Sequence, residues 1–218
     1  MKARGLFITI EGIDGAGKGT QIDHICSYME TEGIELILLR EPGGTSIGEQ
    51  IRGILLGQNN AEMKAMTELL LFAAARAQLV REVIEPALAE GKWILCDRFF
   101  DSTLAYQAGG RGLDRDMVQQ SILLATGGLE PDLTLYLDLD PDVASERRAR
   151  REESLGNEAD RIEREDMIFK RAVRAEYLRL AAELERIVTI DAGGDPLSVW
   201  YEIQQTLTPL VQKHRGGK

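Results

Sequence analysis

The sequence is poor in the residues that build metal clusters, disulfide frameworks and membrane spans. Its 218 residues include only two cysteines, Cys26 and Cys96, and two histidines. Isolated cysteines indicate a reducing compartment and argue against a thiolate metal site. No hydrophobic run approaches the length of a membrane span, and the apolar run near the N-terminus is too short for a signal-peptide core. We therefore expect a cytoplasmic protein.

Basic residues are also fewer than acidic ones. The chain has 26 Lys and Arg against 36 Asp and Glu, a formal net charge of −10. Without a long basic run, a general surface for nucleic acids or anionic membranes is not expected, and anionic ligands must be bound by local clusters of cations. The length and a hydrophobic content of 44% suit one domain over residues 1–218.

A dense group of glycines directly follows an apolar segment. Residues 6–10 predict a buried strand, and residues 12–18 fit the phosphate-loop pattern G-x-x-x-x-G-K. Gly19 stands where a hydroxyl residue is usual, and the hydroxyl follows at Thr20. Such a loop turns its N–H groups toward phosphates, and the next helix adds its positive end. The predicted phosphate-binding residues are Gly12, Ile13, Asp14, Gly15, Ala16, Gly17, Lys18, Gly19 and Thr20.

Apolar segments alternate with helical periodicity along the whole chain. Strands are predicted at residues 6–10, 34–39, 93–96, 133–137 and 187–190. Helices are predicted at 20–33, 47–56, 63–89 with an interruption at Pro86, 117–125, 162–185 and 197–211. This alternation predicts an α/β fold, with a five-stranded parallel sheet flanked by helices. Residues 152–159 are predicted to form a mobile flap within a lid of about 147–161, and residues 213–218 a frayed tail.

Asp97 closes the third predicted strand. A carboxylate at this place in a phosphate-loop fold lies near the nucleotide's magnesium ion and usually contacts it through water. Thr20 and Asp97 are therefore the predicted Mg²⁺ ligands.

Several motifs follow the phosphate loop in a fixed order. They are R-E-P-G-G-T at 40–45, F-A-A-A-R at 72–76, D-R-F-x-x-S-T-L-A-Y-Q at 97–107 and an arginine-rich stretch at 147–151. With them, residues 5–192 closely resemble the thymidylate kinase family. The resemblance implies a nucleoside monophosphate kinase fold, phosphate transfer from ATP to dTMP giving dTDP and ADP, Mg²⁺ with the ATP, and a homodimer.

The resemblance also implies the acceptor site. It assigns the grip on the dTMP phosphate to Arg98, stacking on thymine to Phe72 and a contact with a pyrimidine carbonyl to Arg76. Tyr106 fills the space of a ribose 2′-hydroxyl. The implied dTMP-binding residues are Asp14, Arg40, Glu41, Pro42, Phe72, Arg76, Arg98, Ser102, Thr103, Tyr106 and Gln107. From the residues alone, Phe72 is more readily interpreted as core than as a stacking residue, and the alternatives for Arg98 and Asp14 are pairing with an acid and forming a turn.

Gly15 bears on the source of the catalytic cations. Some thymidylate kinases carry an arginine at this loop position, and those without it use arginines of the lid. The resemblance therefore implies the bacterial type with lid arginines. The candidate catalytic residues are Asp14, Lys18, Arg98, Arg148, Arg150, Arg151 and Arg161. Which lid arginine reaches the transferred phosphate is left open.

Two other functions fit parts of the sequence. The G-x-G-K-G-T stretch with lid arginines also resembles adenylate kinase, so AMP or UMP/CMP is an alternative acceptor. Residues 191–194 fit the D-x-x-G pattern of nucleotide-switched NTPases, but no N-K-x-D motif accompanies them.

Overall fold

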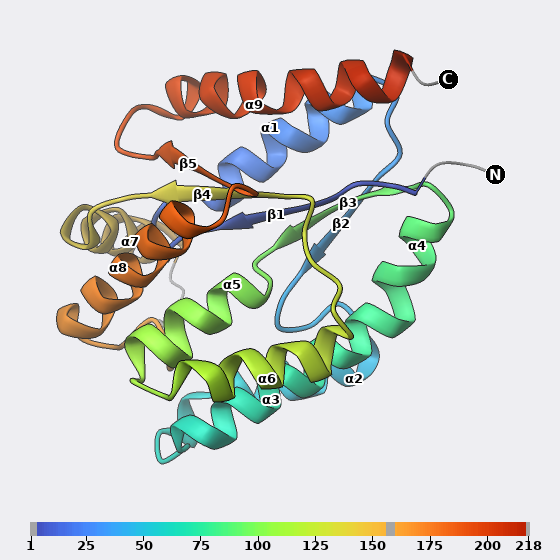
Figure 1. Ribbon diagram of the computed structural model, residues 1–218. Coiled ribbons are helices and arrows are strands. Elements are labelled where there is room, and N and C mark those ends of the chain that lie inside the picture. Colours follow the sequence, from blue (N-terminus) through green and yellow to red (C-terminus); the bar gives the residue numbers. More distant parts are fainter. Residues whose placement is uncertain (1–3, 156–159, 217–218) are drawn as a thin grey trace.

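Five parallel strands form the centre of the computed structural model, which describes residues 4–155 and 160–216 (Figure 1). The strands are β1 (Phe7–Glu11), β2 (Leu36–Arg40), β3 (Trp93–Asp97), β4 (Leu133–Asp138) and β5 (Ile187–Asp191). They pair in the order β2-β3-β1-β4-β5, with Ile8 of β1 in register with Leu95 and Leu133. All residues of β1 are buried, because helices cover both faces. The predicted fold class is confirmed.

The helices are divided between the two faces of the sheet. In Figure 1, α1 (Lys18–Thr31) and α9 (Pro196–Gly216) lie on one face. The other face carries α2 (Ser46–Leu56), α3 (Ala65–Leu79), α4 (Glu85–Ala89), α5 (Phe100–Thr103), α6 (Arg115–Thr126) and α8 (Met167–Glu183). A short 3₁₀ turn, η1 (Gln58–Asn60), follows α2, and α7 (Pro141–Leu155) leaves the carboxyl end of β4.

Two π-helical segments continue helices at places that matter for the fold. The segment η2 (Val80–Ile84) joins α3 to α4, and Pro86 lies in the first turn of α4. Proline has no N–H to donate, and a start position tolerates that loss, so the predicted interruption is a change of helix type. The segment η3 (Leu104–Gly110) extends α5 and carries Tyr106 and Gln107, in a region for which the sequence pattern predicted no element.

Three predicted boundaries are wrong. Residues 152–155 belong to α7, and of the predicted flap only 156–159 lie outside the described residues. The helix predicted from residue 162 begins at Met167, because Asp166 caps it by accepting a hydrogen bond from Phe169 N at 2.8 Å. At the other end of the chain α9 continues to Gly216, and Lys213 and Arg215 suit the negative end of its dipole.

No helix in the described part of the chain combines the length and the hydrophobicity that crossing a membrane requires.

Candidate active site

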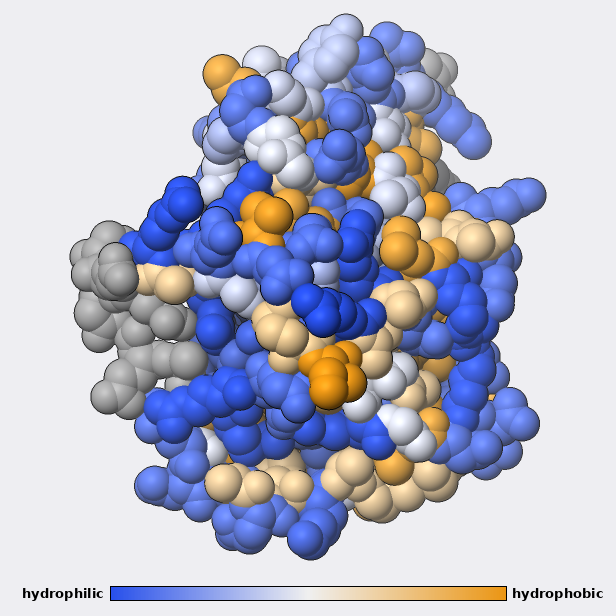
Figure 2. Space-filling model, turned by 90° about the vertical axis from the view of Figure 1, so that its left-hand side faces the viewer, coloured by the Kyte–Doolittle hydropathy of each residue, from blue (hydrophilic) through white to orange (hydrophobic). Residues whose placement is uncertain are grey.

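A cavity of about 780 Å³ lies at the carboxyl ends of β1, β2 and β3. Its walls come from the phosphate loop and α1, the segments after β2 and β3, α2, α3 and η3, α7 and the turn before α8, and the loop after β5 with the start of α9. In open parallel sheets, ligands bind at the carboxyl ends of the strands where the chain changes the direction in which it adds strands. Here that point is at β1, which lies between β3 and β4 in the sheet. Figure 2 views the side of the molecule toward which β1 and β4 point, and hydrophilic residues prevail on it.

The phosphate loop holds Lys18 at its centre. Lys18 Nζ donates to the carbonyl oxygens of Gly12 at 2.9 Å and Ile13 at 3.3 Å, and it lies 3.6 Å from Asp14 Oδ1. Gly12, Gly15 and Gly17 have positive φ angles, a backbone that other residues adopt with strain. Burial and the charge of Arg98 lower the pKa of Lys18. The ammonium group faces the cavity, as an anion site requires.

The space beside Gly15 is filled by the backbone of α7. A Cβ on Gly15 would lie 2.2 Å from the carbonyl oxygen of Ala144. A side chain at this position would therefore require α7 to move. The nearest turn of α7 instead supplies Arg147 and Arg148, which both line the cavity.

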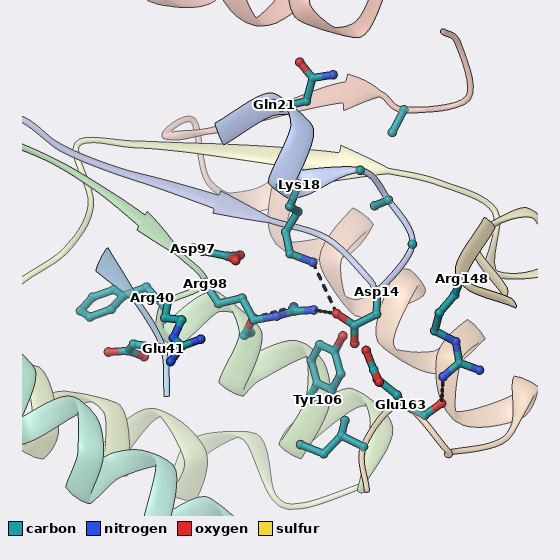
Figure 3. A pocket seen from close by; sticks show the side chains of 18 of the residues that line it. Asp14, Lys18, Gln21, Arg40, Glu41, Asp97, Arg98, Tyr106, Arg148 and Glu163 are labelled. Carbon is teal, nitrogen blue, oxygen red and sulfur yellow. Dashed lines mark hydrogen bonds and ion pairs between the residues drawn. The ribbon is translucent and has the colours of Figure 1, made fainter. Parts of the chain in front are cut away.

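Arg98 and Asp14 form the central ion pair of the site. Arg98 Nη2 lies 2.7 Å from Asp14 Oδ1, and Figure 3 shows both Arg98 and Lys18 directed at this carboxylate. Burial raises the pKa of Asp14, but the two cations outweigh it and hold that pKa well below its usual value. Arg98 has a φ of 69°, the only positive φ of a non-glycine residue in the described chain. Such strain is typical of functional sites.

Glu11, which the sequence analysis missed, supports Arg98 from below. This fully buried carboxylate accepts hydrogen bonds from Phe99 N at 2.7 Å, Ser102 Oγ at 2.6 Å and Tyr177 Oη at 2.8 Å. Ser102 Oγ in turn accepts from Arg98 Nη1 at 3.2 Å. Burial and nearby Asp101 raise the pKa of Glu11 to about 7, against the effect of Arg98. The sequence signal that could have identified Glu11 was an acidic residue at the end of an apolar strand, directly before Gly12.

The predicted base site contains unpartnered polar atoms. Glu41 Oε2 accepts a hydrogen bond from Arg76 Nε at 2.8 Å and forms an ion pair with Arg76 Nη2 at 2.7 Å, and both side chains are buried. Among the described residues, Arg76 Nη1 and Thr103 Oγ1 are buried without a hydrogen-bond partner. Both residues line the cavity together with half-buried Phe72. Buried polar groups in native proteins are nearly always paired, so these two atoms indicate a bound polar ligand.

Arg40 and Arg52 lie at the outer wall of the same region. Arg40 is exposed and pairs with Glu49 at 3.1 Å, while Arg52 Nη1 donates to the carbonyl oxygen of buried Pro42 at 2.8 Å. Both arginines line the cavity. Arg52 was not predicted from the sequence; the available signal was an arginine in the helix that directly follows R-E-P-G-G-T.

The residues at the end of the cavity opposite Arg40 and Glu41 were also not predicted from the sequence as site residues. Gln21 lies there, on the side of α9 and apart from Arg40 and Glu41 (Figure 3). It donates to Pro196 O at 3.0 Å, while its buried Oε1 has no partner among the described residues. Arg147 donates to the carbonyl oxygens of Ala192 at 2.8 Å and Gly193 at 3.1 Å. The loop that fits D-x-x-G thus forms a wall of the cavity.

The candidate lid arginines have different surroundings. Arg148 lines the cavity and donates to Glu163 O at 2.7 Å. Arg150 is exposed on α7, 3.6 Å from Glu146. Arg161 is largely buried against Glu68 at 2.5 Å and is not among the side chains that line the cavity. The side chain of Arg151 lies outside the described residues.

The two predicted Mg²⁺ ligands, Thr20 and Asp97, line the cavity. Asp97 Oδ1 is buried and accepts no hydrogen bond from the described residues, which suits a carboxylate that receives one from metal-bound water. The described residues include no group of three or more His, Cys, Asp or Glu that could hold a metal ion. The two residues fit a magnesium ion whose remaining ligands include phosphate oxygens.

The strand order, the phosphate loop after β1 and the further cations Arg40 and Arg98 in the same cavity indicate a phosphate-loop kinase of the nucleoside monophosphate type. A thymidylate kinase family model matches residues 10–203. The chain belongs to the thymidylate kinase family.

Curated relatives agree with this assignment. The chain is 50% identical to the thymidylate kinase of Pelobacter propionicus over 213 aligned residues. The alignment covers 97% of this chain and 95% of the relative. The chain is 49% identical over 197 residues to the thymidylate kinase of Desulfosudis oleivorans, covering 89% and 92%. Identity to the thymidylate kinase of Pseudomonas fluorescens is 46% over 213 residues, covering 97% and 99%.

Proposed function

We propose that this protein transfers the terminal phosphate of ATP to dTMP, giving dTDP and ADP, in the supply of dTTP for DNA synthesis. The observation that carries the proposal is the pair of unpartnered polar atoms, Arg76 Nη1 and Thr103 Oγ1, in a cavity that continues to the phosphate loop. A pyrimidine ring offers carbonyl and N–H groups to such atoms, and half-buried Phe72 offers a face for stacking. The reaction also fits the expected cytoplasmic location.

The cations of the site have separate tasks in this reaction. Phosphoryl transfer needs two anions placed in line and the charge of the migrating group neutralised. Lys18 and the loop N–H groups bind the phosphates of ATP, and Arg98 binds the phosphate of dTMP through its guanidinium fork. Asp14 fixes the direction of Arg98 and Lys18. We assign the contact with the transferred phosphate to Arg148, because among the lid candidates whose side chains are described it alone lines the cavity.

Mg²⁺ held near Thr20 and Asp97 would neutralise phosphate charge when ATP is bound. The residues of the chain do the remaining work of binding and orientation. Tyr106 lies against Arg98, whose guanidinium carbon is 5.2 Å from the centre of the tyrosine ring. Its ring also contacts Phe169 and Tyr177 edge-on, which fixes it at the cavity wall. We propose that Tyr106 thereby favours a deoxyribose over a ribose.

The test is ADP formation by the purified protein with ATP and Mg²⁺, with dTMP, dUMP, dCMP, AMP and thymidine offered in parallel. We expect strong turnover with dTMP, weaker turnover with dUMP and negligible turnover with the others. Turnover mainly with AMP or dCMP would refute the base site, and turnover with thymidine would refute the roles of Arg40 and Arg98 at an acceptor phosphate.

A homodimer is the proposed assembly. Large apolar side chains are exposed on α2, α3 and α6, and α3 packs against both of the other helices. They are Ile54 at 47%, Leu70 at 57%, Leu123 at 61% and Leu124 at 83% exposure. Exposed apolar surface that spans neighbouring helices favours association with a second copy. Light scattering should give twice the chain mass, and Leu124→Glu should shift it to the monomer; a monomeric wild type would contradict the proposal.

A further inference from the structure

Glu68 is a buried carboxylate beneath the proposed base site, and the proposed reaction does not use it. It lies on α3, is 1% exposed and is not among the side chains that line the cavity. Its Oε1 accepts from Gln107 Nε2 at 2.9 Å and Arg111 Nε at 3.0 Å. Its Oε2 accepts from Arg111 Nη2 at 3.0 Å and Arg161 Nη2 at 2.5 Å. Four hydrogen bonds from three side chains converge on this one group.

The bond from Gln107 decides which end of that side chain reaches the cavity. Gln107 lines the cavity and is 2% exposed. A glutamine amide has a donating NH₂ group and an accepting oxygen, whereas an ionised carboxylate only accepts. Glu68 therefore holds the NH₂ group, and the amide oxygen of Gln107 is directed away from it.

The carboxylate is kept ionised by its neighbours. Burial by itself raises the pKa of Glu68, but the hydrogen bonds from Arg111, Gln107 and Arg161 outweigh burial and lower that pKa below its usual value. Arg111 binds both carboxylate oxygens as a fork. A protonated Glu68 would carry an O–H donor and could then bind either end of the Gln107 amide. The arginines that keep Glu68 ionised therefore preserve the direction of that amide.

Glu41 plays the same part for Arg76. It takes Nε and Nη2, which leaves Nη1 as the unpartnered donor. The two buried carboxylates thus fix a donor at Arg76 and an acceptor at Gln107. Thymine and uracil present the complementary pattern, a carbonyl oxygen beside a ring N–H. Cytosine presents the reverse, an amino group beside an unprotonated ring nitrogen.

We propose that Glu68 is a positioning residue that orients the amide of Gln107, so that the acceptor site prefers bases with a carbonyl and ring N–H edge over cytosine. The proposal rests on the proposed function, since it concerns the acceptor base of that reaction. Arg161 gains a role through it. Arg161, at the end of the predicted lid, forms an ion pair with Glu68 and donates a hydrogen bond to Leu55 O, at the end of α2, at 3.0 Å.

The test compares dUMP with dCMP, which both lack the thymine methyl group and differ only at the edge in question. Calorimetry without ATP gives their affinities, and competition against dTMP gives their inhibition constants. In Glu68→Gln the new amide can offer either end to Gln107, which is then free to rotate. We expect the preference for dUMP over dCMP to fall by about tenfold or more, with the KM for ATP unchanged.

Glu165→Gln is the matched control. Glu165 pairs with Arg111 Nη1 at 2.5 Å, in the same network, whereas the side-chain amide of Gln107 donates to Glu68. It should retain the wild-type preference. Glu68→Gln removes the negative charge that Arg111 and Arg161 share. If this variant does not fold, the double variant Glu68→Gln/Arg161→Met removes one positive charge as well and is tested in its place.

The outcomes separate the two claims. A wild type that neither binds nor phosphorylates dTMP refutes the proposed function. A wild type that prefers dUMP, with a folded Glu68 variant that prefers it equally, refutes the positioning role and leaves the proposed function intact. Equal loss of preference in Glu165→Gln also refutes it, because general disturbance of the network would then explain the effect.

Discussion

Arg98 Nη2 lies 2.7 Å from Asp14 Oδ1, so the segment after β3 is tied to the phosphate loop by an ion pair inside the site. In the proposed reaction the acceptor phosphate has to compete with Asp14 for this guanidinium. The strained backbone of Arg98 is held by its own N–H, which donates to Ile10 O at 3.0 Å, and by the bond from Phe99 N to Glu11. These contacts hold Arg98 in one position, which suits its proposed role at the dTMP phosphate.

Replacing Arg98 tests its role at the acceptor phosphate. Arg98→Met should lower kcat/KM for dTMP on the order of 10²- to 10³-fold, because two charge-assisted hydrogen bonds are lost. Arg98→Lys should restore only part of this loss, since lysine keeps the charge without the fork. Steady-state kinetics with dTMP varied gives both values, and full activity of the lysine variant would contradict bidentate binding.

The lid arginines are distinguished by a pair of variants on one helix. Arg148 lines the cavity, whereas Arg150 is exposed two residues further on. Arg148→Ala should lower kcat by about 10³-fold with little change in the KM for ATP, as removal of a cation from the transferred phosphate does. Arg150→Ala should stay within about threefold of wild type. A larger loss in Arg150→Ala would mean that the lid rearranges during turnover to bring that residue in.

Thr103→Val should raise stability and lower activity together. The Thr103 hydroxyl is buried without a partner among the described residues, so its loss should stabilise the free protein by up to about 1 kcal/mol. The same change should lower kcat/KM for dTMP about 5- to 100-fold, because a ligand contact disappears. Urea unfolding and steady-state kinetics measure the two effects.

The matched variant Thr134→Val gives the opposite stability sign. Its buried hydroxyl bonds Thr9 at 2.8 Å and Asp101 at 3.1 Å, so its loss should cost about 1 to 3 kcal/mol. Destabilisation by Thr103→Val would show that its hydroxyl is paired in the free protein.

Glu11 should make stability depend on pH. Its pKa rises from 4.5 to about 7 on folding, so between these values the folded state binds more protons than the unfolded state. The free energy of unfolding then falls as the pH rises through this window and levels off above it. From pH 5 to pH 8 the wild type should lose about 2 to 3 kcal/mol more than Glu11→Gln, which does not titrate. Urea unfolding at a series of pH values measures this difference. The same change in the free energy of unfolding between pH 5 and pH 8 for both proteins would contradict the assignment to Glu11.

Features that depend on local sequence were predicted well. The strands were located within two residues at each end, because fully buried parallel strands appear as short apolar runs between turn residues. The phosphate loop was predicted from its glycines and Lys18. Boundaries failed where one capping side chain decides them, as Asp166 does for α8.

The sequence by itself therefore determined the strand and helix order, the family and many, but not all, of the polar residues that line the cavity. Tertiary structure decided how those residues are used. Glu11 and Glu68 make hydrogen bonds to partners 88 and 39 residues away, and Arg52 lines the cavity only once α2 has packed into the fold. Arg148 and Arg161 belong to one predicted lid, yet one lines the cavity and the other is buried on Glu68. A side chain's function depends on what lies within a few ångströms of it, and contacts between distant segments exist only once the sheet and its helices have assembled.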